Sequence, residues 1–319
     1  MDKNNFKVSE NSKVISVIVP CYNEEKALIP FYKELVRIID NIKAYTFEVA
    51  FIDDGSKDKT LDIAIDICNK DKRFKYISFS KNFGKEAAML AGLKASSGEY
   101  TVVMDCDLQD PPSILPEMIE AMEQGWDSVA TRRCDRKGEP PIRSFFARKF
   151  YKIMNKISQV DIVDGARDYR MMCREMVDAI ISLQEYHRFM KGIFGWVGFD
   201  TKWIEYENIE RINGETKWSF FKLVLYGIEG IVAFTTVPLK FASLTGVLIS
   251  FAGFIYVTYI VIRTLIFGID VPGYASLISI MMFLGGIQLI ALGIIGEYIS
   301  KTYMEVKNRP HFIIRKTNL

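Results

Sequence analysis

A short run of polar side chains follows an apolar segment in the first half of the chain. Asp105, Asp107 and Gln109 come directly after residues 100–104, which have the composition of a β-strand. If this run is extended, its alternate side chains lie on one side and offer three oxygen ligands to one divalent cation. Mg²⁺ or Mn²⁺ held by two carboxylates keeps positions open for water and for phosphate oxygens of a substrate. The spacing therefore predicts a Mg²⁺ or Mn²⁺ site that receives a phosphorylated substrate.

Two earlier loops also gather polar residues. The first holds Pro20, Tyr22 and Glu24, and the second holds Asp53 and Asp54. Neither has the glycine spacing of a dinucleotide-binding or P-loop motif, so no phosphate cradle is predicted there. Carboxylates accept hydrogen bonds from base N–H groups and ribose hydroxyls, which favours a nucleoside. For Asp53 and Asp54, an Asx turn with a helix N-cap is the alternative.

These loops need a scaffold, which the hydrophobic pattern predicts. Runs of β-branched residues alternate with helical patterns, as is typical of a parallel sheet with crossover helices. We expect strands at residues 14–19, 47–52, 75–79, 100–104 and 128–131, and helices at 24–42, 59–69, 85–95 and 114–124. Ligands of such sheets bind outside the carboxyl ends of the strands, where the polar loops fall.

The C-terminal third has a different composition. Residues 241–262 and 271–296 contain no charged side chain. Each segment is long enough to cross a hydrocarbon layer of about 30 Å as a helix. We expect a transmembrane hairpin with helices at about residues 241–264 and 273–296, and the alternative is a pair of buried core helices in a large soluble domain.

Charged residues indicate where the parts of the chain lie. The loop between the two apolar segments carries one basic residue, Arg263, whereas the outer flanks carry Lys217, Lys222, Lys240, Lys301, Lys307, Arg309, Arg315 and Lys316. Basic residues favour the cytoplasmic side, so both termini are expected there. The first thirty residues contain no apolar stretch, so we expect no signal peptide. The whole chain has 41 Lys and Arg against 39 Asp and Glu, which argues against a nucleic-acid partner.

Seven motifs, in order along the chain, resemble a known enzyme group. Four resemble glycosyltransferase family 2, whose catalytic domain has the GT-A fold: SVIVPCYNEE, FIDDGSKDKT, SFSKNFGKEAAMLAGL and VVMDCDLQDPP. Three resemble bacterial polyisoprenyl-phosphate glycosyltransferases of the bactoprenol glucosyl transferase type, relatives of dolichyl-phosphate mannose synthase: DGARDYRMMCRE, HRFMKGIFGWVGF and RINGETKW. The resemblance implies an α/β protein with a Rossmann-like GT-A nucleotide-sugar-binding domain, a mixed sheet, amphipathic juxtamembrane helices and a C-terminal transmembrane hairpin.

The resemblance also implies roles for individual residues. It implies that Asp105, Asp107 and Gln109 bind the metal and that Asp168 is the catalytic residue, with Asp164 as the alternative. We expect the donor to be bound by Pro20, Tyr22, Glu24, Asp53, Asp54, Lys85, Cys106, Arg133, Arg211 and Lys217. We expect the acceptor phosphate to be bound by Arg143, Arg148, Arg170 and Lys191. For Arg211 and Lys217, a juxtamembrane pair attracted to anionic lipid is the alternative.

Asp168 follows Ala166 and Arg167, where relatives carry small residues. An acceptor phosphate monoester has a second pKa of about 6 and is already mostly dianionic at pH 7. Such a nucleophile does not need a base to remove a proton from it. Asp168 is therefore expected to orient the site, or to repel the acceptor until arginine offsets its charge, rather than to remove a proton.

The chain is expected to divide into four parts. These are a cytoplasmic catalytic domain at 1–215, a juxtamembrane amphipathic segment at 216–236, the hairpin at 237–300 and a basic cytoplasmic tail at 301–319. Aromatic and basic residues alternate around residues 143–157 and 218–225, a pattern typical of helices in the lipid headgroup plane. Core packing is the alternative for these stripes.

The implied activity is inverting transfer of a hexose at the bacterial plasma membrane. The donor would be UDP-glucose, UDP-galactose or UDP-N-acetylglucosamine, and the acceptor undecaprenyl phosphate, with a homo-oligomeric enzyme in the lipid. A processive polysaccharide synthase is one alternative, but Gln184 with Arg188 and Phe189 does not form its Gln-x-x-Arg-Trp element. A non-catalytic membrane scaffold is another, although it would be expected to have lost a metal ligand and this chain keeps all three.

Overall fold

One mixed β-sheet organises the N-terminal part of the protein. The structure, a computed structural model, describes residues 13–133, 163, 165–206, 232, 234–268 and 273–319. Within these residues the sheet has eight strands in the order β7-β5-β6-β4-β1-β2-β3-β8. The strands are β1 (Lys13–Cys21), β2 (Tyr45–Asp53), β3 (Phe74–Phe79), β4 (Tyr100–Val103), β5 (Ser128–Arg133), β6 (Ala166–Cys173), β7 (Thr201–Tyr206) and β8 (Ile314–Thr317).

The strand directions make the sheet mixed. Strand β1 is parallel to β2 and β4, β2 is parallel to β3, and β5 is parallel to β7. Strand β6 runs antiparallel to both β4 and β5, and β8 runs antiparallel to β3. The expected α/β architecture with a mixed sheet is therefore confirmed, and β6, β7 and β8 are strands that the sequence pattern did not predict.

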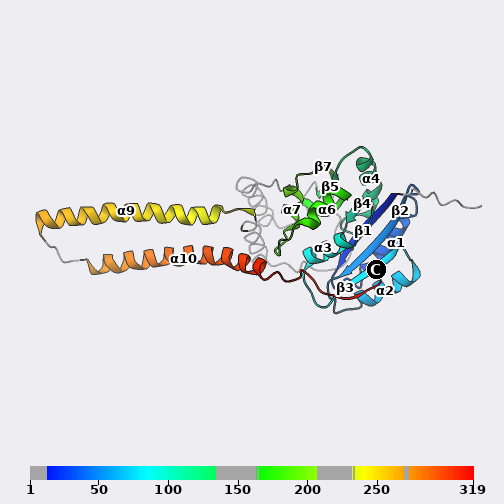
Figure 1. Ribbon diagram of the computed structural model, residues 1–319, viewed down its shortest axis with the longest axis horizontal. Helices are drawn as coiled ribbons and strands as arrows, with labels where there is room; N and C mark the ends of the chain where they lie inside the picture. Colours follow the sequence, from blue (N-terminus) through cyan, green and yellow to red (C-terminus); the bar gives the residue numbers. More distant parts are fainter. Residues whose placement is uncertain (1–12, 134–162, 164, 207–231, 233, 269–272) are drawn as a thin grey trace, which may run out of the picture.

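Helices cover both faces of this sheet (Figure 1). They are α1 (Leu28–Ile39), α2 (Thr60–Lys70), α3 (Lys85–Ala95), the short η1 (Pro112–Ile114), α4 (Leu115–Glu123), α6 (Arg174–Ser182) and α7 (Met190–Trp196). Apolar side chains of α1, α2 and α4 join one buried cluster, and those of α3, α6 and α7 join a second. The four helices expected from the sequence are all present: α3 has the expected bounds, α2 is shifted by one residue, and α1 and α4 are shorter than expected.

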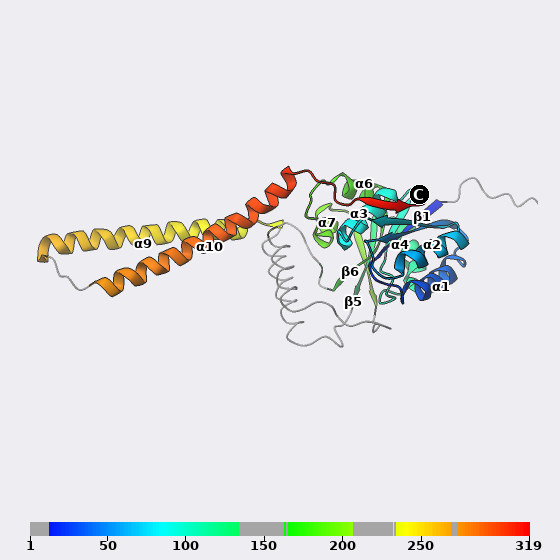
Figure 2. The ribbon, with the colours of Figure 1, turned by 90° about the horizontal axis from the view of Figure 1, so that it is seen from below.

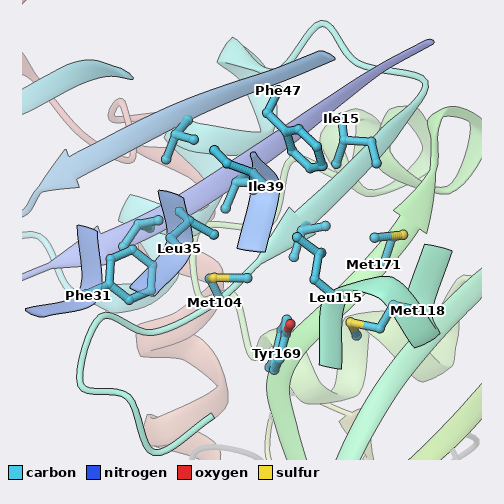
Figure 3. Packing of buried hydrophobic residues seen from close by; sticks show 14 of the residues in the cluster. Ile15, Phe31, Leu35, Ile39, Phe47, Met104, Leu115, Met118, Tyr169 and Met171 are labelled. Carbon is cyan, nitrogen blue, oxygen red and sulfur yellow. The ribbon is translucent and has the colours of Figure 1, made fainter. Parts of the chain in front are cut away.

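Alternation along β1 divides these two cores. Ile15, Val17 and Val19 belong to the first cluster and Ile18 to the second, as the two-residue period of a strand requires. Figure 3 shows Phe31 and Leu35 of α1 among the core side chains. Each such side chain, when fully buried, stabilises the fold by about 1.5–3 kcal/mol. The sheet is therefore held rigidly from both faces, and its carboxyl-end loops start from fixed positions.

The hairpin extends away from the sheet as two long helices that run side by side (Figures 1 and 2). Helix α9 spans Val237–Phe267 and α10 spans Tyr274–Val306, and each contains a stretch apolar and long enough to cross a membrane. Both helices exceed the expected 241–264 and 273–296. Pro238 lies in the first turn of α9, where proline is tolerated, and the helix ends at Gly268 with φ 78°. Helix α10 continues through the charged residue Lys301, which lies near its C-terminal end.

The C-terminus differs from the expected basic tail. Residues 301–306 continue α10, and β8 then pairs with β3 at the edge of the sheet, beside which the C-terminus lies (Figure 2). The ring of Phe312 stacks on Phe79 with centroids 5.0 Å apart, and Ser80 donates its N–H to Ile313 O at 2.9 Å. The segment that follows the hairpin is therefore bound back to the eight-stranded sheet. The amphipathic segments around 143–157 and 216–231 lie outside the described residues.

Candidate active site

The β2–α2 loop at the carboxyl edge of the sheet is built around Asp53 and Asp54. Asp53 accepts hydrogen bonds from Ser56 N at 3.0 Å and from Ser78 Oγ at 2.7 Å. Asp54 accepts from Phe83 N at 2.6 Å and Gly84 N at 2.9 Å, which ties it to the β3–α3 loop. Burial raises the pKa of Asp54 to about 6, against the effect of these N–H donors.

Both carboxylates are almost completely buried, at 2% and 3% exposure. Their oxygens serve to build neighbouring loops, but neither residue caps α2, whose N-cap position is Lys59, so the N-cap part of the alternative is wrong. Gly55 fits the same turn, because its φ of 67° is left-handed and a Cβ there would lie 2.4 Å from the carbonyl carbon of Lys81. Contact between Asp53 or Asp54 and a nucleoside stays a prediction.

The β1–α1 loop is joined to the β2–α2 loop. Asn23 N donates to Ser56 Oγ at 3.0 Å, and Glu24 N donates to Thr60 Oγ1 at 2.8 Å. Pro20 is buried at the end of β1, whereas Tyr22 keeps 39% of its surface exposed. The side chain of Tyr22 is thus open to a base, and the donor contacts of Pro20, Tyr22 and Glu24 stay predictions.

The loop after β4 is a turn rather than an extended run. Strand β4 ends at Val103, and Leu108 has φ 58°, in the left-handed region. Gln109 N donates to Asp107 Oδ1 at 3.1 Å, which closes the turn. The expectation that residues 105–109 alternate along an extended segment is therefore wrong. Cys106 is buried at 3% exposure, which leaves its backbone rather than its thiol for a donor contact.

Lys85 joins two of the predicted site residues. At the start of α3, its Nζ lies 2.7 Å from Asp105 Oδ1 and 2.6 Å from Asp168 Oδ2. Asp168 reaches this place because β6 runs antiparallel beside β4, with Arg170 opposite Val103. Burial raises the pKa of Asp168, but the charges of Lys85 and Lys191 outweigh it and hold that pKa well below its usual range. The role of Asp168 in the reaction stays a prediction.

Glu86 and Lys191 complete this side of the site. The carboxylate of Glu86 accepts a hydrogen bond from Met190 N, at the start of α7, at 3.2 Å. Burial, followed by the charge of Asp168, raises the pKa of Glu86 to about 8. Lys191, one residue further on α7, lies close enough to lower the pKa of both carboxyls. Glu86 was not among the residues singled out from the sequence, since a glutamate in the first turn of a helix is common.

The other side of the site carries two arginines. Arg133 Nη2 lies 3.3 Å, and Arg167 Nη2 3.4 Å, from the same atom, Gln109 Oε1. Arg167 also donates from Nε to Asp110 Oδ1 at 2.8 Å. The structure thus places Arg133 beside the predicted metal ligand Gln109, and adds Arg167 and Asp110, which sequence reasoning did not assign. The adjacency of Asp110 to Gln109 and of Arg167 to Asp168 was the available signal.

Arg170 requires a correction. It is 4% exposed, and its guanidinium lies 4.2 Å from the ring centroid of Phe194 and 5.6 Å from that of Trp203. Alternation on β6 turns it away from Arg167 and into the second core, so in this structure a lipid phosphate has no access to it. The other predictions at Arg143, Arg148, Asp164, Arg211 and Lys217 fall outside the described residues.

The donor set after β4 fits a divalent cation that is shared with a substrate. Asp105, Asp107 and Gln109 supply two carboxylates and one amide oxygen in one turn. No group of three or more His, Cys, Asp or Glu side chains that could hold a metal occurs within the described residues. Mg²⁺ is usually held by one or two carboxylates plus substrate phosphates rather than by an all-protein cage, and binding of a cation by these three residues stays a prediction.

Comparison with known proteins identifies the family. Residues 16–181 match the model of glycosyl transferase family 2. The chain belongs to this family. Residues 237–302 match the GtrB C-terminal hairpin, so the family domain and the hairpin together account for the two regions seen in the structure. The resemblance inferred from the seven motifs is confirmed.

Relatives of this family member extend over nearly the whole chain. The putative glycosyltransferase CsbB of Bacillus subtilis (strain 168) is 46% identical over 306 residues, covering 96% of this chain and 92% of the relative. The bactoprenol glucosyl transferase of Shigella phage SfII is 43% identical over 304 residues, covering 95% and 98%. The solved structure of glucosyl-3-phosphoglycerate synthase from Mycobacterium tuberculosis with Mn²⁺, UDP-glucose and phosphoglyceric acid aligns with a TM-score of 0.47 and 18% identity, covering 69% of this chain and 78% of that one.

Proposed function

We propose that this family 2 enzyme transfers a hexose from a UDP-sugar to undecaprenyl phosphate at the cytoplasmic face of a bacterial plasma membrane. The observation that carries the proposal is the cluster of Asp105, Lys85 and Asp168 at the carboxyl edge of a sheet that is bound to an apolar hairpin. The relative named bactoprenol glucosyl transferase, at 43% identity over almost its full length, supports the lipid acceptor.

The chemistry needs binding and charge stabilisation more than proton transfer. A phosphate oxygen of the acceptor attacks the anomeric carbon, and the bond from that carbon to the diphosphate oxygen breaks with inversion, so that UDP leaves with the electron pair. When bound, Mg²⁺ or Mn²⁺ would offset the charge of the departing diphosphate. Asp105, Asp107 and Gln109 would hold the cation.

Asp168 and its cations have a defined part in this reaction. The low pKa of Asp168 keeps it ionised, and its contact with Lys85 fixes that cation beside Asp105. Lys191, which lies near Asp168, is placed to attract the acceptor phosphate. The acceptor phosphate is already mostly dianionic at neutral pH, so the reaction does not require Asp168 to remove a proton.

The membrane arrangement follows from the same features. Both α9 and α10 meet the sheet domain at one end of the hairpin (Figure 1). The excess of Lys and Arg at that end supports a cytoplasmic location of the catalytic domain and of both termini. The apolar surface that α9 and α10 present supports association of hairpins from several copies in the lipid, as in a homo-oligomer.

Membranes that contain the full-length protein test the function. We expect labelled sugar from one of UDP-glucose, UDP-galactose or UDP-N-acetylglucosamine to enter a lipid fraction when undecaprenyl phosphate is added. EDTA or Asp107→Ala should abolish transfer, whereas Asp40→Ala, which removes a surface carboxylate paired with Arg73, should not. Transfer that survives both EDTA and Asp107→Ala would contradict the metal site.

A further inference from the structure

A buried charged group lies behind the predicted metal ligands. Asp110 is 1% exposed, and its Oδ1 accepts from Arg167 Nε at 2.8 Å and also from the hydroxyl of Tyr206. The three residues come from the loop after β4, from β6 and from β7. Asp110 therefore holds one edge of the Arg167 guanidinium, and Tyr206 holds Asp110 in turn.

The other edge of Arg167 lies at the site. Its Nη2 is within 3.4 Å of Gln109 Oε1, and its side chain retains 22% exposure. The charge of Asp105 acts on Arg167, and the charge of Arg167 acts in turn on Asp168. Arg167 thus connects the loop of the predicted metal ligands with the carboxylate bound to Lys85.

Stability alone is a weak reason for this arrangement. A buried ion pair often contributes no more than apolar side chains of similar volume would, because both charges lose their hydration. Moreover, Arg133 and Arg167 bring two guanidinium groups to the same amide oxygen, Gln109 Oε1. Like charges repel at such short range, whereas an anion bound between them would offset both. The planar fork of arginine suits phosphate oxygens in particular.

We propose that Arg167 binds the diphosphate of the nucleotide-sugar beside Arg133, and that Asp110 and Tyr206 are positioning residues that hold its guanidinium in place. This inference rests on the proposed function, since it assigns a residue to the donor of that reaction.

Calorimetric titration of the full-length protein in detergent tests the proposal, with Mg²⁺ and either UDP or uridine as the ligand. Arg167→Ala should weaken UDP binding by about tenfold to a hundredfold, the range of a lost hydrogen bond to a charged group. Uridine binding should not change, because uridine carries no phosphate. Arg167→Lys should give an intermediate loss, since lysine keeps the charge but not the fork.

The positioning residues and a matched control complete the experiment. Tyr206→Phe keeps the ring and removes one hydrogen bond, so it should weaken UDP binding by a few-fold, about two to ten times, without changing uridine binding. Arg132→Ala is the control: Arg132 lies on β5 next to Arg133 but pairs with Glu205 at the surface, 41% exposed, and should leave UDP binding unchanged.

The outcomes separate this proposal from the function on which it rests. Unchanged UDP binding in Arg167→Ala would overturn it. Unchanged UDP binding with a raised KM for undecaprenyl phosphate would also overturn it, and would assign Arg167 to the phosphate of the acceptor. Selective loss of UDP binding in a protein that transfers no sugar would support the role of Arg167 and contradict the proposed function.

Discussion

The sheet domain, residues 13–206 together with β8, and the hairpin treat their apolar side chains in opposite ways. Leu35 and Phe51 in the sheet domain are 0% exposed, whereas Leu248 and Phe251 on α9 are 61% and 65% exposed. None of the residues of α9, all of which the structure describes, is buried. The sheet domain therefore gains its stability by excluding water from its own interior, and α9 and α10 need an apolar surrounding such as lipid.

The two regions meet at contacts close to the active site. Glu305, at the end of α10, accepts from Tyr186 N at 2.8 Å, and Phe312 stacks on Phe79. Phe79 in turn packs edge-on against Phe83, whose N–H is bound by Asp54. The loop that Asp54 holds is therefore in contact with the segment that follows the hairpin. These contacts fix the position of the hairpin's end relative to the loops at the carboxyl edge of the sheet.

The largest difference between the regions should appear when leucine is truncated in each. Leu35→Ala should lower the free energy of unfolding of the sheet domain by about 2–5 kcal/mol, because it leaves a cavity in the core. Leu248→Ala, the matched change on α9, should alter it by less than about 0.5 kcal/mol. Urea denaturation of the full-length protein in detergent, followed by tryptophan fluorescence, measures both. Equal losses of unfolding free energy in the two variants would contradict the conclusion that the sheet domain buries its apolar side chains and α9 does not.

A smaller effect is expected where the regions are joined. Phe312→Ala should lower the free energy of unfolding by about 1–3 kcal/mol through lost stacking and burial. It should also speed amide hydrogen exchange at Tyr76 and Ser80, whose N–H groups bind Asn318 and Ile313. Phe251→Ala on α9 is the control and should change neither. Unchanged exchange in Phe312→Ala would mean that β8 holds to the sheet without this ring.

A third effect concerns a charged group of the sheet domain. The pKa of Glu86 is raised from 4.5 to about 8, so the folded protein binds its proton more tightly than the unfolded chain does. The stability that this supplies is present at low pH and is lost as the pH rises toward 8.

The substitution Glu86→Gln should remove this loss, because glutamine has no proton to release. The thermal midpoint should then fall less between about pH 6.5 and pH 8.5 than in the unchanged protein, a range that avoids the titration of Asp54. Glu117→Gln, at an exposed position on α4, is the control. An equal fall in the Glu86→Gln protein and in the unchanged one would contradict the raised pKa.

The sequence predicted best what depends on local patterns. Runs of β-branched and other apolar residues at 14–19 and 47–52 predicted β1 and β2, and the longer apolar runs predicted the hairpin. Strand β8 was missed because its pairing with β3 joins residues about 240 positions apart and its Arg315 and Lys316 are charged. An edge strand with exposed basic side chains has the composition of a tail.

The site shows the same limit. Asp105 and Lys85 were predicted, and the structure joins them. The contact of Arg167 with Asp110 spans 57 residues and depends on the antiparallel register of β6 with β4 and β5, which no local pattern specifies. Arg170 was assigned to a phosphate from the family resemblance, and only the alternation of β6 in the folded sheet places it in the core.

The most direct test of the whole account is the identity of the lipid product. Purified full-length protein, Mg²⁺, undecaprenyl phosphate and each UDP-sugar in turn should yield, by mass spectrometry, undecaprenyl phosphate that carries one hexose unit. The same reaction without the lipid should release no sugar-containing product. A polymer, or no lipid-linked sugar with any donor while the protein still binds UDP, would contradict the account.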